Sequence, residues 1–404
     1  MIQGLALLFL PIGMILVLWL EMFDGLDHGS AVTVVACGLS LFLGIMLYFT
    51  RVDEMELRVE HIGRAENLVL FSSLLVFLYL GYMTLIYGPS PALLFFMDGS
   101  VPPELLHGRY RQVMPLRSVL PPLVIVQTFF ALRVLPRRST VKNFIAKGMT
   151  VLSLFAFSMI VDTRHVLLWP MLYFVCEKFS RISSLRRLMT KKKMLYVLLI
   201  FILVWQSFVA LGNIRIGSDA VEFGARQLAI DFSLNPMYWD FPGVVIWAII
   251  YLFSGFARGI DRENEIEVFH FDLQEALFPG FLQFIPSALG LQVAVATDRF
   301  SQQAMAIDGY HDLCLVYGFL FGTLLFVIPV FLFIYLVHRI NRHCRSADFV
   351  GVGSYVLFLW LGVRILLLPI GSYVFTFGDS MEGMFLYFFM RMVNVHVVEK
   401  RDIK

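Results

Sequence analysis

LCLVYGFLFGTLLFVIPVFLFIYLV, residues Leu313–Val337, is long and apolar enough to cross a bilayer, whose hydrocarbon core takes about 20 helical residues. A second such stretch, Met194–Leu211, lies upstream. The far ends of the two stretches carry the basic residues Arg186, Arg187, Lys191, Lys192, Lys193, His338, Arg339, Arg342 and Arg345. Because basic flanks remain in the cytoplasm, the sequence predicts that Asn213–Asp312, between the two stretches, faces outward.

The composition excludes a soluble globular protein. Of the 404 residues, 59% are hydrophobic and 15% are charged, whereas about a quarter of the residues in a soluble domain are charged. A net charge of +2, with no basic stripe among exposed aromatics, gives no indication of a nucleic-acid partner. We expect an all-α polytopic membrane protein with about 8 full transmembrane helices, some re-entrant or broken helices and a large periplasmic region.

The other apolar stretches complete this topology. They are Gly4–Leu20, Ala31–Thr50, Asn67–Tyr87, Leu116–Leu135, Val350–Ile370 and Gly383–Val398. Arg51, Arg58 and Arg64 after the second stretch, and the tail Lys400–Lys404, are placed in the cytoplasm. The chain then divides into N-terminal transmembrane helices (1–211), a periplasmic catalytic region (212–312), and C-terminal helices with a cytoplasmic tail (313–404).

Two apolar segments do not fit a simple crossing. Met149–Cys176 has basic flanks at both ends but is shorter than the roughly 40 residues that two crossings take. It is either a re-entrant dip or two short tilted helices across a thinned bilayer, and in both cases Arg164 in its polar turn faces protein or water. Phe241–Phe256 is expected to be a re-entrant or interfacial helix. If it crossed the membrane, the basic end of Leu313–Val337 would lie outside the cytoplasm.

The outward region contains arginine but no lysine, which favours planar, multidentate binding of carboxylate or phosphate. Arg215 and Arg226 follow the outer end of a span, and they either hold an anionic substrate or pair with nearby acids and lipid headgroups. Arg299 lies one loop upstream of His311 and is a candidate for the same site as His311. Arg258 follows the apolar dip, where it is either a further ligand or an interfacial anchor.

His311 stands directly before Leu313–Val337, with Asp308 and Asp312 on either side in the sequence. An imidazole beside carboxylates acts as a proton acceptor when its pKa is raised, and the alternative is a histidine that caps the helix. The four cysteines fall in predicted spans or on the cytoplasmic side, and no Asp-x-Asp motif occurs in an outer loop. We therefore expect neither a metal nor another cofactor.

Three patterns together resemble the bacterial O-antigen polymerase and ligase superfamily, most of all its Wzy-type oligosaccharide repeat-unit polymerases. Thr163-Arg164-His165 is similar to a Ser-Arg-Gly turn of that superfamily, with histidine in place of glycine. The arginine-bearing loop Asn213–Gln227 follows a basic cytoplasmic loop and a span, as in those proteins. Tyr310-His311-Asp312-Leu313 resembles the ligases' His-Asn/Ser-x-Tyr-Leu element, and Gly318 and Gly322 are similar to its Gly-x-x-Gly, one residue longer.

The resemblance implies a metal-independent, inverting glycosyltransferase of the bacterial inner membrane, active on the periplasmic side. Its donor and acceptor would both be oligosaccharides on undecaprenyl diphosphate, and a chain-length regulator and a flippase would be further partners beside membrane lipids. Arg215 and Arg226 would neutralise the departing diphosphate, with Arg299, Arg258 and Arg164 as further candidates. His311 would orient or deprotonate the attacking sugar hydroxyl.

Two other functions are open. An O-antigen ligase would use the same chemistry with another lipid as acceptor. A transporter or flippase for an anionic glycolipid or solute is indicated by Arg164 and Arg364 at membrane depth, since charges there often mark a pathway. The absence of an internal sequence repeat and the gathering of arginines on one side favour one-sided chemistry instead.

Overall fold

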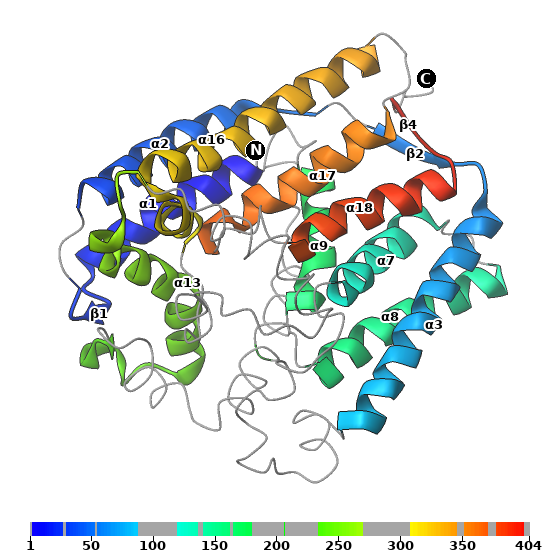
Figure 1. The fold of residues 1–404 in the computed structure, drawn as a ribbon, viewed down its shortest axis with the longest axis horizontal. Coiled ribbons are helices and arrows are strands. Elements are labelled where there is room, and N and C mark those ends of the chain that lie inside the picture. The colour runs from blue at the N-terminus through cyan, green and yellow to red at the C-terminus, as the bar shows by residue number, and fades with distance from the viewer. Residues whose placement is uncertain are drawn as a thin grey trace, which may run out of the picture. The chain divides into compact units, whose positions relative to one another are not determined.

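The structure, a computed structural model, describes residues 2–26, 30–52, 55–87, 119–135, 140–161, 165–179, 206, 233–269, 308–345, 351–370 and 377–399 (Figure 1). These residues are mostly helical and form two compact units. The first unit comprises Met1–Arg51, Ile182–Ile334 and Leu361–Thr376, and the second comprises Val52–Arg181, Tyr335–Trp360 and Phe377–Lys404. Each unit is thus assembled from segments that lie far apart in the sequence.

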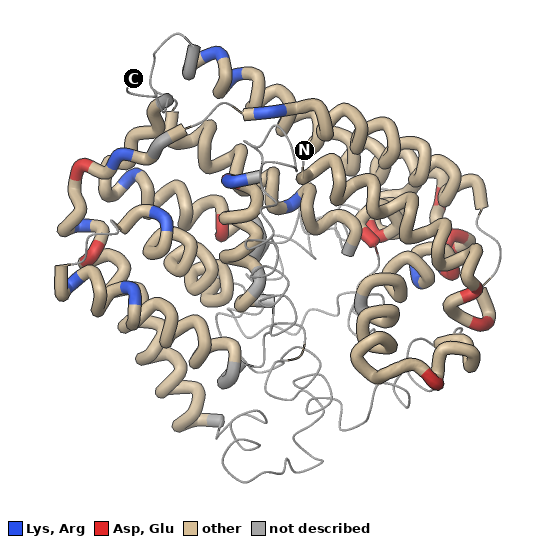
Figure 2. Tube along the Cα trace, turned by 180° about the vertical axis from the view of Figure 1, so that it is seen from behind, with Lys and Arg blue, Asp and Glu red and all other residues tan. Residues whose placement is uncertain are grey.

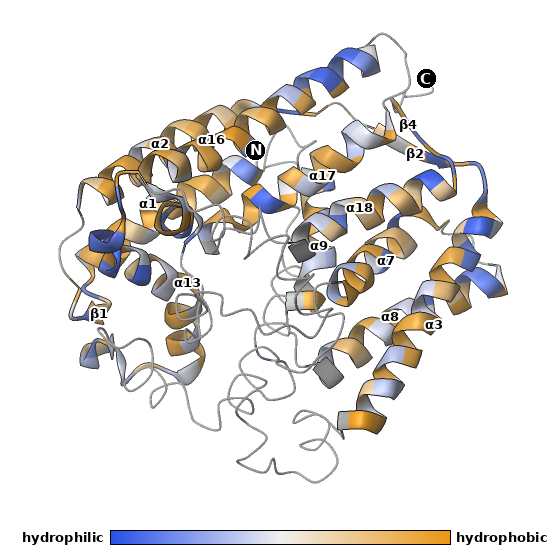
Figure 3. Cartoon of the chain, viewed as in Figure 1, coloured by the Kyte–Doolittle hydropathy of each residue, from blue (hydrophilic) through white to orange (hydrophobic). Residues whose placement is uncertain are grey.

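Among the described residues, four helices are long and apolar enough to cross a membrane. They are α1 (Ile2–Trp19), α2 (Ala31–Phe49), α3 (Ile62–Tyr87) and α16 (Gly309–Arg345). Helix α13 (Gly243–Asp261) is bent by 42° and becomes a fifth if its halves form one span. Figure 3 shows apolar residues over most of these helices.

The structure confirms the expected helical membrane protein in outline. The shorter helices α7 (Leu120–Val134) and α17 (Val352–Leu367) are also apolar, and α17 continues into the 3-10 turn η5 (Leu368–Ile370). The number of crossings stays a prediction, because the predicted span Met194–Leu211 lies outside the described residues except for Gln206. The three-part division of the chain by membrane side also stays a prediction.

In the first unit, α1 packs against α2 and α13. Leu7, Leu10, Met14 and Val17 recur at helical spacing and lie on the buried face of α1. The Phe9 ring of α1 lies 5.8 Å from the Phe256 ring of α13. The short strands β1 (Phe23–Asp24) and β3 (Ser233–Leu234) pair antiparallel, and the 3-10 turn η1 (Pro236–Tyr238) follows β3. This packing places the start of α2 close to the end of α13.

Helix α16 is interrupted at Gly318, whose φ of 76° and ψ of 164° are not helical. A positive φ of this kind is readily adopted by glycine and costly for other residues. The next backbone N–H, that of Phe319, donates to the carbonyl of Glu267 at 2.8 Å. A Cβ on Gly322 would lie 2.6 Å from Cys314 Cα, so the turns on either side of the interruption pack closely. The entrance of α16 is therefore a separate short helix.

The second unit is a bundle of α3, α7, α8 (Val141–Val161), α9 (His165–Phe179) and α18 (Phe377–Met392). Buried polar pairs join its helices. Gln127 donates to Ser153 at 2.7 Å, and Tyr173 donates to Glu382 at 2.8 Å. Such hydrogen bonds satisfy polar groups in an interior that offers no water.

Arg133 and Glu177 form a bidentate ion pair in this bundle. Arg133 Nε lies 2.7 Å from one Glu177 oxygen, and its terminal nitrogen lies 2.7 Å from the other. The hydroxyl of Tyr355 donates to the same carboxylate at 3.0 Å. The Glu177 side chain is fully buried, so the bidentate arginine compensates its charge.

The predicted broken segment 149–176 corresponds to α8 and α9, and residues 162–164 between them are outside the described residues. Helix α8 begins at Val141, earlier than expected, and includes part of the basic flank. Its polar start is consistent with a helix that extends beyond the apolar segment. The choice between a dip and two tilted helices stays open.

The predicted span Gly383–Val398 was wrong at both ends. Helix α18 begins earlier, at Phe377, and ends at Met392. Residues Val395–Glu399 form strand β4, which pairs antiparallel with β2 (Met55–Val59), Val395 opposite Val59. The valines of β4 are β-branched and favour a strand once a partner strand is present. Hydropathy alone could not separate this apolar strand from the helix before it.

Charged residues are sparse along the helices and gather near helix ends (Figure 2). In α16, Asp312 lies in the first turn, whereas Arg339 and Arg342 lie near the far end. The side of the membrane on which each end lies stays a prediction.

Candidate functional site

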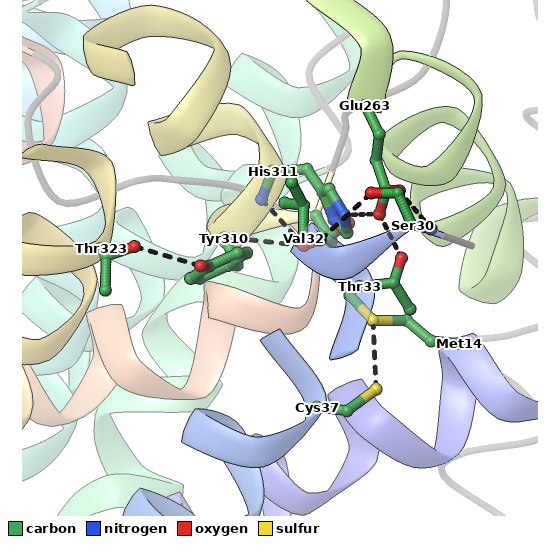
Figure 4. Close-up of polar contacts among 10 residues, drawn as sticks. Met14, Ser30, Val32, Thr33, Cys37, Glu263, Tyr310, His311 and Thr323 are labelled. Atoms are coloured by element: carbon green, nitrogen blue, oxygen red, sulfur yellow. Dashed lines mark hydrogen bonds and ion pairs between the residues drawn. The ribbon is translucent and has the colours of Figure 1, made fainter. Parts of the chain in front are cut away.

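Five residues of the first unit meet where α2, the 3-10 turn η2 (Glu263–Glu265) and α16 begin. Figure 4 shows Glu263 pointing between Ser30 and Thr33 of the α2 segment on one side and His311 of α16 on the other. Asp308 contacts the other edge of the His311 ring. We call Ser30, Thr33, Glu263, Asp308 and His311 the acid–histidine cluster.

His311 is the centre of this cluster. Its Nδ1 lies 2.7 Å from Asp308 Oδ2, and its Nε2 lies 3.0 Å from Glu263 Oε1. The side chains of His311 and Asp308 are fully buried, and that of Glu263 is 3% exposed. When both carboxylates are ionised, each ring nitrogen carries a proton and its N–H donates a hydrogen bond to a carboxylate. His311 is then an imidazolium with no free lone pair.

Asp308 joins the entrance of α16 to α13. Its Oδ1 accepts from the backbone N–H groups of Tyr310 at 3.1 Å and His311 at 3.2 Å. The first N–H groups of a helix have no carbonyl partner within the helix, and an aspartate just before the first turn is a preferred residue to accept their hydrogen bonds. The N–H of Asp308 in turn donates to the carbonyl of Gly255 at 3.2 Å. The carboxylate that orients His311 is therefore itself fixed.

Glu263 lies at the N-terminus of α2, where a carboxylate interacts favourably with free N–H groups. Its Oε2 accepts from the N–H of Ser30 at 2.7 Å, and its Oε1 accepts from the Thr33 hydroxyl. Burial raises the pKa of Glu263, but hydrogen bonds from His311, Ser30 and Thr33 outweigh it and lower the pKa to about 2. Glu263 therefore remains ionised at neutral pH.

Gly259 of α13 makes room for the cluster. A Cβ at this position would lie 2.6 Å from His311 Nδ1 and 2.7 Å from His311 Cγ, and it would also meet the Asp308 carboxylate. These separations are shorter than ordinary van der Waals contact. Only a residue without a side chain fits between α13 and the paired Asp308 and His311.

Tyr310 and Thr323 fix the entrance of α16 from its other side. The Tyr310 hydroxyl and Thr323 Oγ1 lie 3.1 Å apart, and Thr323 also donates to the Phe319 carbonyl at 2.7 Å. The Tyr310 ring packs edge-on against Phe326. Residues after Gly318 thus fix Tyr310, the chain neighbour of His311.

The predicted site residues are only partly described. Arg164, Arg215, Arg226 and Arg299 lie outside the described residues, so their roles in binding diphosphate stay predictions. Arg258 lies near the end of α13 and is 3% exposed, which places it inside the first unit rather than at its surface.

The structure brings His311 together with Asp308, as predicted, but the second carboxylate at the ring is Glu263 rather than Asp312. Glu263, which lies in the charged stretch Asp261–Glu267, was not singled out from the sequence. The signal available was an acidic residue just after an amphipathic helix, in the same predicted outer region as His311. That pattern did not single out Glu263 from its acidic neighbours.

Among the residues that the structure describes, no group of His, Cys, Asp and Glu side chains has an arrangement that could hold a metal ion. The cluster instead places a buried imidazole between two carboxyl groups. Such an arrangement can orient a neighbouring group, hold a fixed charge or transfer a proton.

Comparison of the chain with protein-family models, with curated proteins and with solved structures found no significant match.

Proposed function

We propose that the protein is a membrane-embedded glycosyltransferase that polymerises oligosaccharide repeat units carried on undecaprenyl diphosphate. The observation that supports this most directly is the acid–histidine cluster at the entrance of α16. Ionisable groups inside a membrane protein are costly and usually serve function. This cluster lies at the element that resembles the polymerase and ligase superfamily, around His311.

The chemistry needs few groups. A lipid diphosphate is already a good leaving group, so catalysis requires charge stabilisation, positioning of the acceptor hydroxyl and one proton acceptor. Arg215, Arg226 and Arg299 are proposed to bind the diphosphate, with Arg258 and Arg164 as further candidates. The acid–histidine cluster is proposed to orient and deprotonate the attacking hydroxyl.

The test is the length of the glycan made by cells that carry single substitutions. Arg215→Ala, Arg226→Ala and His311→Ala are each expected to leave the protein in the membrane and to abolish long glycan chains. Arg339→Ala, which removes an exposed arginine near the opposite end of α16 from His311, serves as the control and should give normal chains. Normal chain-length ladders in all three variants would refute the proposal.

The location of the reaction has a separate test. In a cysteine-free background, single cysteines at positions 215 and 226 are expected to react with a membrane-impermeant thiol reagent added from the periplasmic side. Labelling from the cytoplasm alone would contradict the proposed inner-membrane, periplasm-facing site.

A ligase is separated from a polymerase by the product that accumulates in a deletion strain. A single repeat unit on the surface lipid indicates loss of a polymerase. Long polymer that remains on undecaprenyl diphosphate indicates loss of a ligase.

A transporter is the second candidate, because chains of Asp, His and Glu inside membrane proteins are also used to relay protons. The cluster joins Asp308, His311 and Glu263 in one such chain. Purified protein in liposomes with an imposed pH gradient would distinguish the two functions. Uptake of an anionic glycolipid without formation of a longer glycan would favour transport.

A further inference from the structure

We propose that Arg64 and Arg391 bind the headgroup phosphate of an anionic phospholipid, at the end of the second unit where α3 begins and α18 ends. The proposal concerns contact with the bilayer and does not depend on the proposed glycosyl transfer. Three features of the two arginines carry it: the helix faces on which they lie, their closeness to each other, and their lack of an acidic partner among the described residues.

Arg64 lies at the start of an exposed apolar face of α3. The side chains of Phe71, Leu78 and Leu85 are exposed and recur at intervals of about two helical turns, so they share one face. Arg64 is exposed and precedes Phe71 by the same interval. Because α3 is long and apolar enough to cross a membrane, its exposed apolar face is covered by lipid. Arg64 therefore stands where that lipid-covered face ends.

The position of Arg64 along α3 matches the headgroup layer. Tyr82 is exposed on the same face near the other end of the helix, about 27 Å away at about 1.5 Å per residue. The hydrocarbon core of a bilayer is about 30 Å thick, and tyrosine is enriched at its two surfaces. When α3 crosses the bilayer, Arg64 and Tyr82 therefore lie at opposite surfaces of the hydrocarbon core.

Arg391 has the corresponding position on α18. Met384 and Phe388 are exposed at a spacing of about one helical turn, so they lie on one face in the second half of this helix. Arg391 is exposed, follows Phe388 on that face and belongs to the last turn of α18. The exposed apolar face of α18 thus also ends in an arginine.

The chain around the β2–β4 ladder brings these two helix ends together (Figure 1). The N–H of His61, just before α3, donates to the carbonyl of Val393, just after α18, at 3.4 Å. Arg64 lies in the turn that follows His61, and Arg391 lies in the turn that precedes Val393. The first turn of α3 and the last turn of α18 are therefore side by side, and each presents one arginine.

Neither arginine forms a salt bridge with an acidic residue in the part of the chain that the structure describes. Glu60, in the same connection, already has partners: one oxygen accepts from Asn394 Nδ2 at 3.3 Å, and the other lies 2.9 Å from His396 Nε2. A Cβ on Gly63, next to Arg64 in the chain, would meet no atom within 4 Å. The guanidinium groups are therefore available to an anion from outside the protein.

A phospholipid phosphate fits this place. A guanidinium group can donate to two phosphate oxygens at once, and anionic lipids attract basic residues at the membrane surface. The apolar faces that lead to Arg64 and Arg391 contact the acyl chains of the same lipid layer. The diphosphate of the proposed substrate offers similar chemistry, but the sequence places Arg64 on the cytoplasmic side and that substrate on the other. The ligand proposed here is therefore an anionic phospholipid such as phosphatidylglycerol.

The experiment gives the purified full-length protein equal amounts of phosphatidylglycerol and phosphatidylcholine in detergent, and native mass spectrometry measures which lipid stays bound. One basic residue near a membrane surface favours an anionic lipid about fivefold, which corresponds to about 1 kcal/mol. The wild-type protein should therefore retain phosphatidylglycerol about 25-fold better than phosphatidylcholine. Arg64→Gln and Arg391→Gln should each lower this preference about fivefold, and the double variant should retain the two lipids almost equally.

Arg339→Gln is the matched control, because it removes the same charge from an exposed position on α16 and should change the preference less than about twofold. Arg64→Lys keeps the charge and should retain most of the preference. The unfolding temperature without added lipid should be the same in all variants, since the replaced side chains are exposed, and this measurement separates loss of the site from misfolding.

Three results would overturn the proposal. The first is equal retention of the two lipids by the wild-type protein, or an unchanged preference in the double variant. The second is an equal loss in Arg339→Gln, which would show a response to net charge alone. The third is displacement of phosphatidylglycerol by an equal amount of undecaprenyl diphosphate, which would assign the two arginines to the lipid-linked substrate instead.

Discussion

Replacing Gly259 by alanine tests the geometry of the acid–histidine cluster without removing any of its polar groups. The new methyl group would lie 2.6 Å from His311 Nδ1, whereas ordinary contact begins near 3.4 Å. The ring or α13 must therefore move by about 0.8 Å, enough to stretch a 2.7 Å hydrogen bond beyond useful range.

The expected cost follows from these contacts. A hydrogen bond to a charged group contributes about 1.5–3 kcal/mol, and both bonds of His311 are disturbed together. We take the loss of stability from the disturbed hydrogen bonds as about 3 kcal/mol. Alanine has a higher helix propensity than glycine, which adds back up to about 1 kcal/mol. We expect Gly259→Ala to lower the free energy of unfolding by about 2 kcal/mol.

Gly38→Ala in α2 is the matched control, because a Cβ at Gly38 meets nothing within 4 Å. It should leave stability unchanged or raise it by up to about 1 kcal/mol. Thermal unfolding in detergent can be followed with a thiol-reactive dye, since Cys176 and Cys314 are buried in the folded protein. A difference of about 3 kcal/mol corresponds to about 6–12 °C at roughly 2–4 °C per kcal/mol. Equal unfolding temperatures for the two variants would refute the reasoning.

Two further predictions concern buried charges. Because the pKa of Glu263 is lowered to about 2 from 4.5, its contribution to stability is complete above about pH 4.5 and is lost as the pH falls toward 2. At about 1.36 kcal/mol per pKa unit, Glu263→Gln should therefore lower the free energy of unfolding at pH 6 by up to about 3 kcal/mol. The difference between variant and wild type should be smaller at pH 3. Unfolding measurements that give the same difference at both pH values would contradict this. In the second unit, Arg133→Ala leaves the buried Glu177 charge without its bidentate partner and should cost about 3–5 kcal/mol. Adding Glu177→Gln should recover part of that loss in the same assay, and a double variant as unstable as Arg133→Ala would argue against charge as the cause.

The apolar helices could be predicted from the sequence because a membrane span requires a continuous run of apolar residues. The predicted spans Gly4–Leu20 and Ala31–Thr50 differ from α1 and α2 by at most two residues at either end. The composition of such a segment is enough to predict an apolar helix, without information on the residues that pack against it.

Features that depend on distant partners were not predictable in this way. Strand β4 exists because β2, far away in the sequence, supplies its hydrogen-bond partners. Glu263 joins the site because η2 lies beside the N-terminus of α2, which the sequence does not reveal. The pairing of His311 with Asp308 was predictable, since a spacing of three residues at a helix start brings the two side chains together.

The ladder between β2 and β4 limits how the chain can thread the bilayer. Strand β2 ends at Val59, just before α3 begins, and β4 starts at Val395, just after α18 ends. Two hydrogen-bonded strands have to lie in the same aqueous compartment. The chain therefore leaves Val59 and reaches Val395 on the same side of the membrane. The number of passages between Val59 and Val395 is therefore even, and this parity holds for any assignment of inside and outside.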